Sequence, residues 1–103
     1  MEKKKYKLFG TTWTLKKVDS TTNPDGDWAY GCTFPTQRLI EISTKDDKGK
    51  LLPNQEVRIT TMHEIIHSIF ETGQYLQSNL DEPQVEWLAR CLITLIDQGV
   101  FDL

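Results

Sequence analysis

The chain has 103 residues, with 12 Lys and Arg against 15 Asp and Glu, and a formal net charge of −3. This length predicts a single domain over residues 1–103. The acidic balance argues against nucleic acid as a partner, because no surplus of cations is present to displace counterions from phosphates. We find no secretion signal and no apolar run of about 20 residues, so we expect a cytoplasmic protein without a membrane segment.

The first half of the chain has the pattern of β-strands. Residues 13–18 form the first expected strand, and a turn at 23–26 (Asn-Pro-Asp-Gly) follows it. In residues 28–34 large apolar side chains alternate with small or polar ones, which is typical of a half-buried strand. Residues 38–43 are expected to form a third strand. The pattern therefore predicts a small, mostly antiparallel three-stranded sheet, with residues 1–10 as a flexible or edge segment.

Apolar side chains occupy every second position of the expected strand at 28–34. They are Trp28, Tyr30, Cys32 and Phe34. We expect this set to form the apolar face of the strand, with Trp28 and Phe34 in the core. Cys32 and Cys91 are the only cysteines, and without an export signal we expect both to be free, buried thiols.

The second half of the chain has helical periodicity. Asn54 is expected to cap a helix that Gly73 ends. Between them, five apolar residues recur at helical spacing and form one stripe: Met62, Ile65, Ile66, Ile69 and Phe70. A second helix is expected to begin near Asp81, where an acidic cap precedes a first-turn proline, and to end at Gly99. Two main helices on a small sheet indicate an α+β fold.

The most informative motif is His63-Glu64-Ile65-Ile66-His67, an H-E-x-x-H sequence inside the first expected helix. Residues four apart share a helix face, so both imidazoles can reach one metal ion at about 2.0–2.1 Å. Glu64 projects from the next position, where it can take a proton from a water that zinc activates. The motif therefore predicts Zn²⁺ as the cofactor and peptide-bond hydrolysis with Glu64 as the general base.

A zinc site of this kind needs a third protein ligand, and the chain has only 2 histidines. Cys32 is a weak candidate, because it belongs to the apolar face of its strand. A carboxylate is therefore required, and Glu86 fits best, because it lies within the second helix, one step beyond a buried position. Glu82 and Asp81 remain alternatives, although capping of the helix explains both. For Glu86 the alternative role is an ion pair with Arg90, four residues later.

These features resemble the gluzincin pattern of zinc metallopeptidases, in which a glutamate on a later helix follows H-E-x-x-H. The small metallopeptidases of phages and mobile elements are the most similar in length. The resemblance covers residues 38–99, and Val85-Glu86-Trp87-Leu88-Ala89 is similar to the glutamate helix of the family. It implies a zincin-like fold and a peptide or protein substrate. It also implies that His63, His67 and Glu86 bind zinc and that Glu64 is the general base.

The same resemblance implies that the strand at Arg38–Thr44 borders the cleft, where an extended peptide pairs with its backbone. Larger gluzincins place an Asn just before the ligand glutamate and an Asp four residues after it. Counted from Glu86, this chain has Val85 and Arg90 at those positions. Tyr75 or Tyr30 is the candidate that stabilises the oxyanion through a phenolic hydrogen bond.

A second hypothesis, from a different class, is a zinc-stabilised binding or regulatory module that cleaves nothing. Under this hypothesis zinc raises the melting temperature, and Glu64→Gln leaves the function unchanged. Within the peptidase class, a regulatory protease that cuts one repressor is the related interpretation. In each case we expect a monomer.

Overall fold

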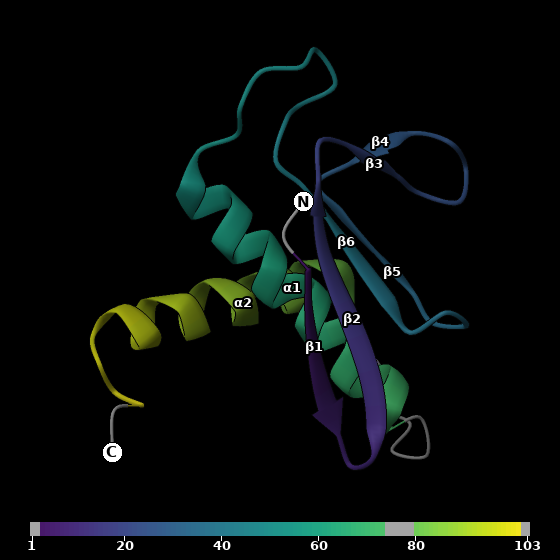
Figure 1. The fold of residues 1–103 in the computed structure, drawn as a ribbon. Coiled ribbons are helices and arrows are strands. Elements are labelled where there is room, and N and C mark those ends of the chain that lie inside the picture. The colour runs from purple at the N-terminus through teal and green to yellow at the C-terminus, as the bar shows by residue number, and fades with distance from the viewer. Residues whose placement is uncertain (1–2, 74–79, 102–103) are drawn as a thin grey trace.

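The computed structural model describes residues 3–73 and 80–101, which fold into a main sheet, a small two-stranded sheet, a helix α1 and a second helix α2 (Figure 1). The main sheet has four strands in the order β1-β2-β6-β5. Their bounds are Lys3–Leu8 for β1, Thr11–Val18 for β2, Leu39–Ser43 for β6 and Gly31–Phe34 for β5. The outer pairs are antiparallel, whereas the central pair, β2 and β6, is parallel.

The α+β class and a mostly antiparallel sheet, both predicted from the sequence, are confirmed, but the predicted number of three strands is wrong. Residues 3–8 add a fourth strand at one edge, because they form a hairpin with β2 around Phe9 and Gly10. Parallel neighbours need a long crossover connection. The residues between β2 and β6 supply that connection and contain three further strands.

The strand expected at 28–34 is divided at Tyr30. Its first part, β4 (Trp28–Ala29), pairs with β3 (Thr21–Thr22) in a separate two-stranded sheet, and its second part is β5. The assignment of faces was also wrong, because it is Gly31 and Thr33 that face α1. Tyr30 is 52% exposed and belongs to neither core.

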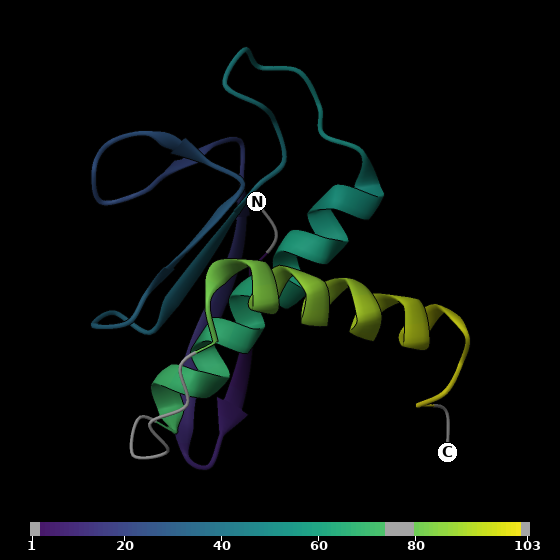
Figure 2. The same cartoon turned by 180° about the vertical axis from the view of Figure 1, so that it is seen from behind.

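Helix α1 (Asn54–Thr72) is the middle layer, between the main sheet and α2 (Glu82–Asp97), as Figures 1 and 2 show from opposite sides. One buried cluster joins α1 to the sheet and centres on Trp13, Leu15, Ile40, Ile42 and Val57. A second cluster joins α1 to α2 and centres on Ile59, Ile66, Val85, Ala89 and Ile93. Each face of α1 therefore packs on a different partner.

This two-sided burial explains why the single apolar stripe predicted for α1 is only partly right. Ile65 packs against the sheet cluster, whereas Met62, Ile66 and Phe70 belong to the cluster with α2. Ile69 lies between the two contacts and is 46% exposed. A helix that contacts two layers distributes its apolar side chains over two faces.

The N-terminal ends of the two helices differ in how they are capped, and the cap of α2 determines where Glu82 lies. Helix α1 follows Pro53 and has no side-chain cap, so the predicted capping role of Asn54 is wrong. Helix α2 begins with a capping box, in which Asp81 accepts from the backbone of Gln84 and the Gln84 side chain accepts from the backbone of Asp81. This box fixes Glu82 as the first residue of α2.

Two further sequence expectations concern the cysteines and the membrane. Cys32 and Cys91 are both free thiols, and both are partly buried. Within residues 3–73 and 80–101, neither helix combines the length and the apolar character needed to cross a membrane.

Candidate metal centre

Two histidines of α1 and the first glutamate of α2 converge on one point. The Nε2 atoms of His63 and His67 lie 3.2 Å apart. The carboxylate of Glu82 meets both rings, with Oε2 at 2.9 Å from His63 Nε2 and Oε1 at 3.0 Å from His67 Nε2. One ligand atom from each of the three residues lies within 4.8 Å of the others. His63 and His67, paired in the sequence motif, are thus brought together with one carboxylate.

The spacing of these donors fits a tetrahedral zinc ion. Ligand atoms placed 2.0–2.1 Å from one zinc at tetrahedral angles lie about 3.3 Å from each other. The two imidazole nitrogens are 3.2 Å apart, close to that value, and each lies about 3 Å from its own oxygen of the Glu82 carboxylate, Oε2 for His63 and Oε1 for His67. Two imidazoles and a carboxylate are also a donor set that zinc accepts. The chemistry and the spacing of the donors therefore fit the metal that the motif predicts.

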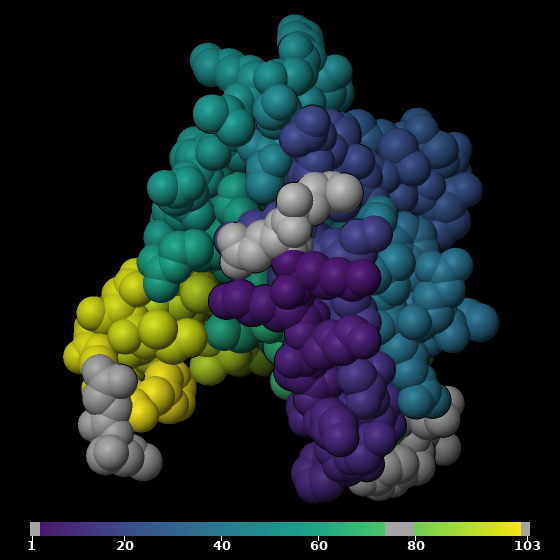
Figure 3. All heavy atoms as spheres, viewed as in Figure 1, coloured from purple at the N-terminus to yellow at the C-terminus, as the bar shows by residue number. Residues whose placement is uncertain are grey.

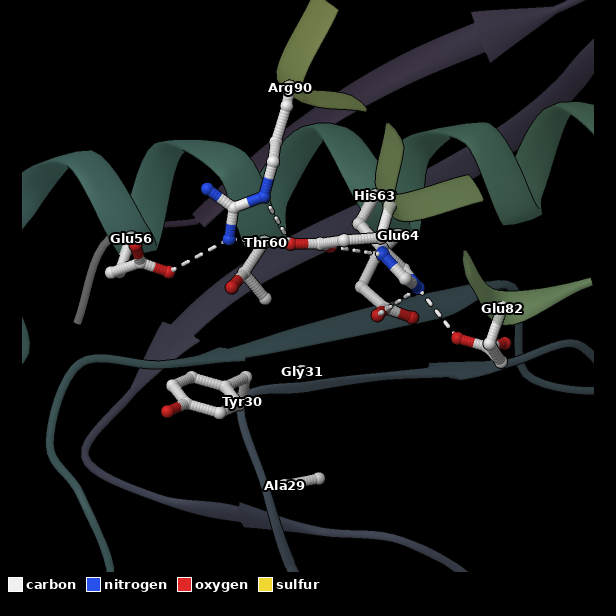
Figure 4. A pocket seen from close by; sticks show the side chains of 10 residues that line it. Ala29, Tyr30, Gly31, Glu56, Thr60, His63, Glu64, Glu82 and Arg90 are labelled. Carbon is white, nitrogen blue, oxygen red and sulfur yellow. Dashed lines mark hydrogen bonds and ion pairs between the residues drawn. The ribbon is translucent and has the colours of Figure 1, made fainter. Parts of the chain in front are cut away.

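Glu86, the carboxylate that the sequence favoured as the third ligand, lies at the other nitrogen of His63. Its Oε1 is 2.9 Å from His63 Nδ1. Its Oε2 accepts a hydrogen bond of 2.9 Å from Nε of Arg90 and forms an ion pair with Nη2 of the same residue at 2.8 Å. The alternative role predicted for Glu86, an ion pair with Arg90, is therefore present. The Arg90 guanidinium also lies 3.7 Å from Glu56 on the first turn of α1 (Figure 4).

The other sequence candidates have different surroundings. Asp81 is engaged in the capping box of α2. Cys32 lines a cavity beside His67 but is not a member of the group whose ligand atoms converge. Tyr30 lines the larger cavity together with His63, as Figure 4 shows. Tyr75 lies outside the described residues.

Glu64 is buried at the bottom of the site, with 8% of its surface exposed. Its Oε1 accepts a hydrogen bond of 2.8 Å from the hydroxyl of Thr33 on β5, and its Oε2 lies 3.9 Å from His63 Nε2. Burial raises the pKa of the Glu64 carboxyl above its ordinary value, although the Thr33 hydrogen bond and the two imidazoles oppose that shift. A carboxyl with a raised pKa is suited to take up and release a proton.

Two cavities open on either side of this centre. The larger, of about 430 Å³, extends from His63 past Tyr30 to Arg90, and the smaller, of about 290 Å³, extends from His67 past Thr33. Both are lined by Gly31, Glu64 and Glu82, so the glutamates stand between them. The two cavities therefore adjoin each other at the site where the three donors converge.

The strand that borders the cavities is β5. The resemblance implied that Arg38–Thr44 has this place, but β6 is hydrogen-bonded to β2 on one side and to β5 on the other. Among the described residues, β5 is the outer strand at this end of the sheet, and Gly31 and Thr33 contribute to the cavity walls. That expectation is therefore corrected from β6 to β5.

Gly31 allows β5 to approach α1 closely. A Cβ atom at this position would lie 2.8 Å from Cγ2 of Thr60, 3.0 Å from Cγ of Glu64 and 3.2 Å from Cδ1 of Ile42. We therefore expect Gly31→Ala to lower the free energy of unfolding by about 1–3 kcal/mol, the usual effect of overpacking. Urea denaturation measures this change.

Thr60→Ser offers a suppressor of this change, because it removes the methyl group nearest to the added Cβ. The double variant is expected to recover part of the lost free energy of unfolding. A single variant that unfolds within 0.5 kcal/mol of the wild type would contradict the close contact.

Comparison with protein-family models, with curated proteins and with solved structures finds no match to this chain. A function must therefore be inferred from the side chains that converge at the start of α2 and from the two cavities beside them.

Proposed function

We propose that this chain is a zinc-dependent peptidase in which His63, His67 and Glu82 hold the metal. The observation that carries the proposal is the convergence of two imidazole nitrogens and one carboxylate oxygen within 4.8 Å. The buried Glu64 beside them and the cavities on both sides are the further features that a hydrolytic site requires. The earlier preference for Glu86 as a ligand is replaced in this proposal by Glu82.

The change of ligand also improves the resemblance to gluzincins. Counted from Glu82, the residue four positions later is Glu86, a carboxylate where larger members have an Asp. The residue just before is Asp81, where they have an Asn. The contact of Glu86 with His63 Nδ1 has the geometry by which an outer carboxylate orients a metal-binding imidazole.

In the proposed reaction each side chain has a separate task. A zinc ion, when bound, supplies a Lewis acid that polarises the peptide carbonyl and lowers the pKa of water to about 7. Glu64 accepts the proton of the attacking water and later donates it to the leaving amine. Glu86 keeps His63 in the tautomer that carries its proton on Nδ1, which leaves Nε2 free to ligate. Tyr30, in the larger cavity, is the described candidate for a hydrogen bond to the oxyanion, and Tyr75 stays a prediction.

Zinc content and peptide cleavage together test the proposal. We expect one zinc per chain, and cleavage of a peptide mixture that a chelator abolishes and added zinc restores. At 100 times the Kd, zinc stabilises the fold by about 2.7 kcal/mol. In a domain of this size that stabilisation raises the Tm by roughly 10–20 °C.

The possible outcomes separate the competing interpretations. Zinc binding with no cleavage by the wild type would favour the second hypothesis, a zinc-stabilised binding module. Absence of zinc binding would contradict both, because each depends on the same three donors.

A further inference from the structure

The cavities beside the candidate metal centre are strongly acidic. Apart from the histidines, their charged lining consists of five glutamates and one arginine: Glu56, Glu64, Glu71, Glu82, Glu86 and Arg90. Arg90 is already held by Glu86 at 2.8 Å and lies 3.7 Å from Glu56. A bound divalent cation would therefore leave an excess of negative charge along the cleft.

The smaller cavity contains an exposed carboxylate, that of Glu71, which has no ion-pair partner among the described residues. Glu71 lies on the last turn of α1, one turn after His67, and both line this cavity. It makes no hydrogen bond or ion pair with the residues at 3–73 and 80–101. Neither Lys nor Arg occurs among the described lining residues, and the sequence of residues 74–79 has no charged side chain. Apart from His67, the described lining of this cavity offers Glu71 no cationic side chain, which leaves its carboxylate open to a cationic group of a ligand.

The lysines of the chain lie mainly at the opposite edge of the sheet. Six of the nine are on β1 and β2: Lys3, Lys4, Lys5, Lys7, Lys16 and Lys17. In the strand order, β1 and β5 are at opposite ends, as Figure 1 shows, and Figure 3 shows the purple strand β1 on the near face of the molecule. Charge is thus separated across the molecule, with the acidic cavities at the β5 end. Such a field attracts cations to the cleft and slows anions.

We infer that the cleft takes a basic polypeptide segment, and that Glu71 selects a Lys or Arg side chain in the smaller cavity. The inference rests on the proposed function, because it names the substrate class of the same site. Glu71 acts as a specificity-determining residue. Its carboxylate pairs with the ammonium or guanidinium group of the substrate residue nearest to His67, while the rest of the segment lies along β5.

Pairs of peptides that differ in one charge test this inference. One peptide carries Lys at a single variable position, and its partner carries norleucine, which keeps the stem and lacks the charge. For the zinc-loaded wild type we expect kcat/KM about 5-fold higher with Lys at low salt, the size of an exposed ion pair. The ratio should fall towards one at 0.5 M salt, because salt screens exposed charges.

In Glu71→Gln, kcat/KM for the Lys peptide should exceed kcat/KM for the norleucine peptide by less than about 2-fold. Asp47→Asn is the matched control, since it removes one exposed negative charge from a turn that lines neither cavity. This control should keep the wild-type ratio. A ratio near one in the wild type, or an equal loss in both variants, would overturn the inference.

Binding to the zinc-loaded Glu64→Gln variant separates this inference from the proposed function. Fluorescence polarisation with the same labelled peptides should give a Kd about 5-fold lower for the Lys peptide. If no peptide is cleaved by the wild type but this preference is present, the peptidase proposal fails and the inference stands. If peptides are cleaved without any preference for charge, the peptidase proposal stands and the inference fails.

Discussion

Replacing Glu82 with Gln should remove high-affinity zinc binding, whereas the same change at Glu86 should weaken it by about 10-fold. Glu82 reaches both Nε2 atoms, at 2.9 and 3.0 Å, and a neutral amide is a much poorer zinc ligand. Glu86 touches only Nδ1 of His63, and the oxygen of Gln can still accept that hydrogen bond. Loss of an outer partner typically costs 10–100-fold in metal affinity, so we expect the low end of that range for Glu86.

Competition with a zinc-sensitive dye measures both affinities on the folded variants. The two substitutions are matched, because each turns one glutamate of α2 into its amide, four residues apart on one helix face. We expect the zinc affinity to fall by more than about 100-fold in Glu82→Gln and only slightly in Glu86→Gln. A larger loss of zinc affinity in Glu86→Gln than in Glu82→Gln would show that Glu86 is the ligand and that Glu82 only stabilises the start of α2.

Replacing Glu64 with Gln should lower peptide hydrolysis by about 10²- to 10⁴-fold and leave the zinc content unchanged. This range is the usual contribution of a general acid–base group. Glu64 is outside the three-donor group and is held instead by the Thr33 hydroxyl at 2.8 Å, a hydrogen bond that the oxygen of Gln can also accept. Because burial already disfavours the charged carboxyl, the neutral amide should not destabilise the fold.

Rates of cleavage and zinc per chain, measured on the same preparations, check this expectation. Glu41→Gln is a suitable control, since it neutralises a β6 carboxylate that bonds to Thr21 and lines neither cavity. The control should cleave at the wild-type rate. Activity of Glu64→Gln within 3-fold of the wild type would exclude Glu64 as the general base.

Local features of the sequence were enough to find the two helices and the histidine pair. His63 and His67 lie one turn apart on any α-helix, so the motif sets their separation before any tertiary contact forms. The capping role of Asp81 was equally readable, because a capping box involves neighbouring residues only. The spacing of Glu82 and Glu86, four apart, was also visible, and it is the signal that could have indicated a ligand followed by its orienting carboxylate.

Other parts of the site depend on which elements become neighbours. Thr33 and Gly31 were placed on the wrong face in the sequence-based interpretation, because alternation reveals two faces of a strand but not which one meets a helix. Here the small side chains meet α1, since the close approach at Gly31 leaves no room for a larger one. The contact of Arg90 with Glu56 likewise joins two helices whose relative placement no local pattern specifies.

The sequence by itself determined that this protein has an H-E-x-x-H helix, a capped second helix and an α+β composition of elements. Only the tertiary structure decided which carboxylate faces the histidines, and that β5 rather than β6 borders the cavities. The physical reason is the same in both cases. Spacing within one helix is set by hydrogen bonds between near neighbours, whereas the crossing of α2 over α1 and the order of the strands follow from packing between distant segments.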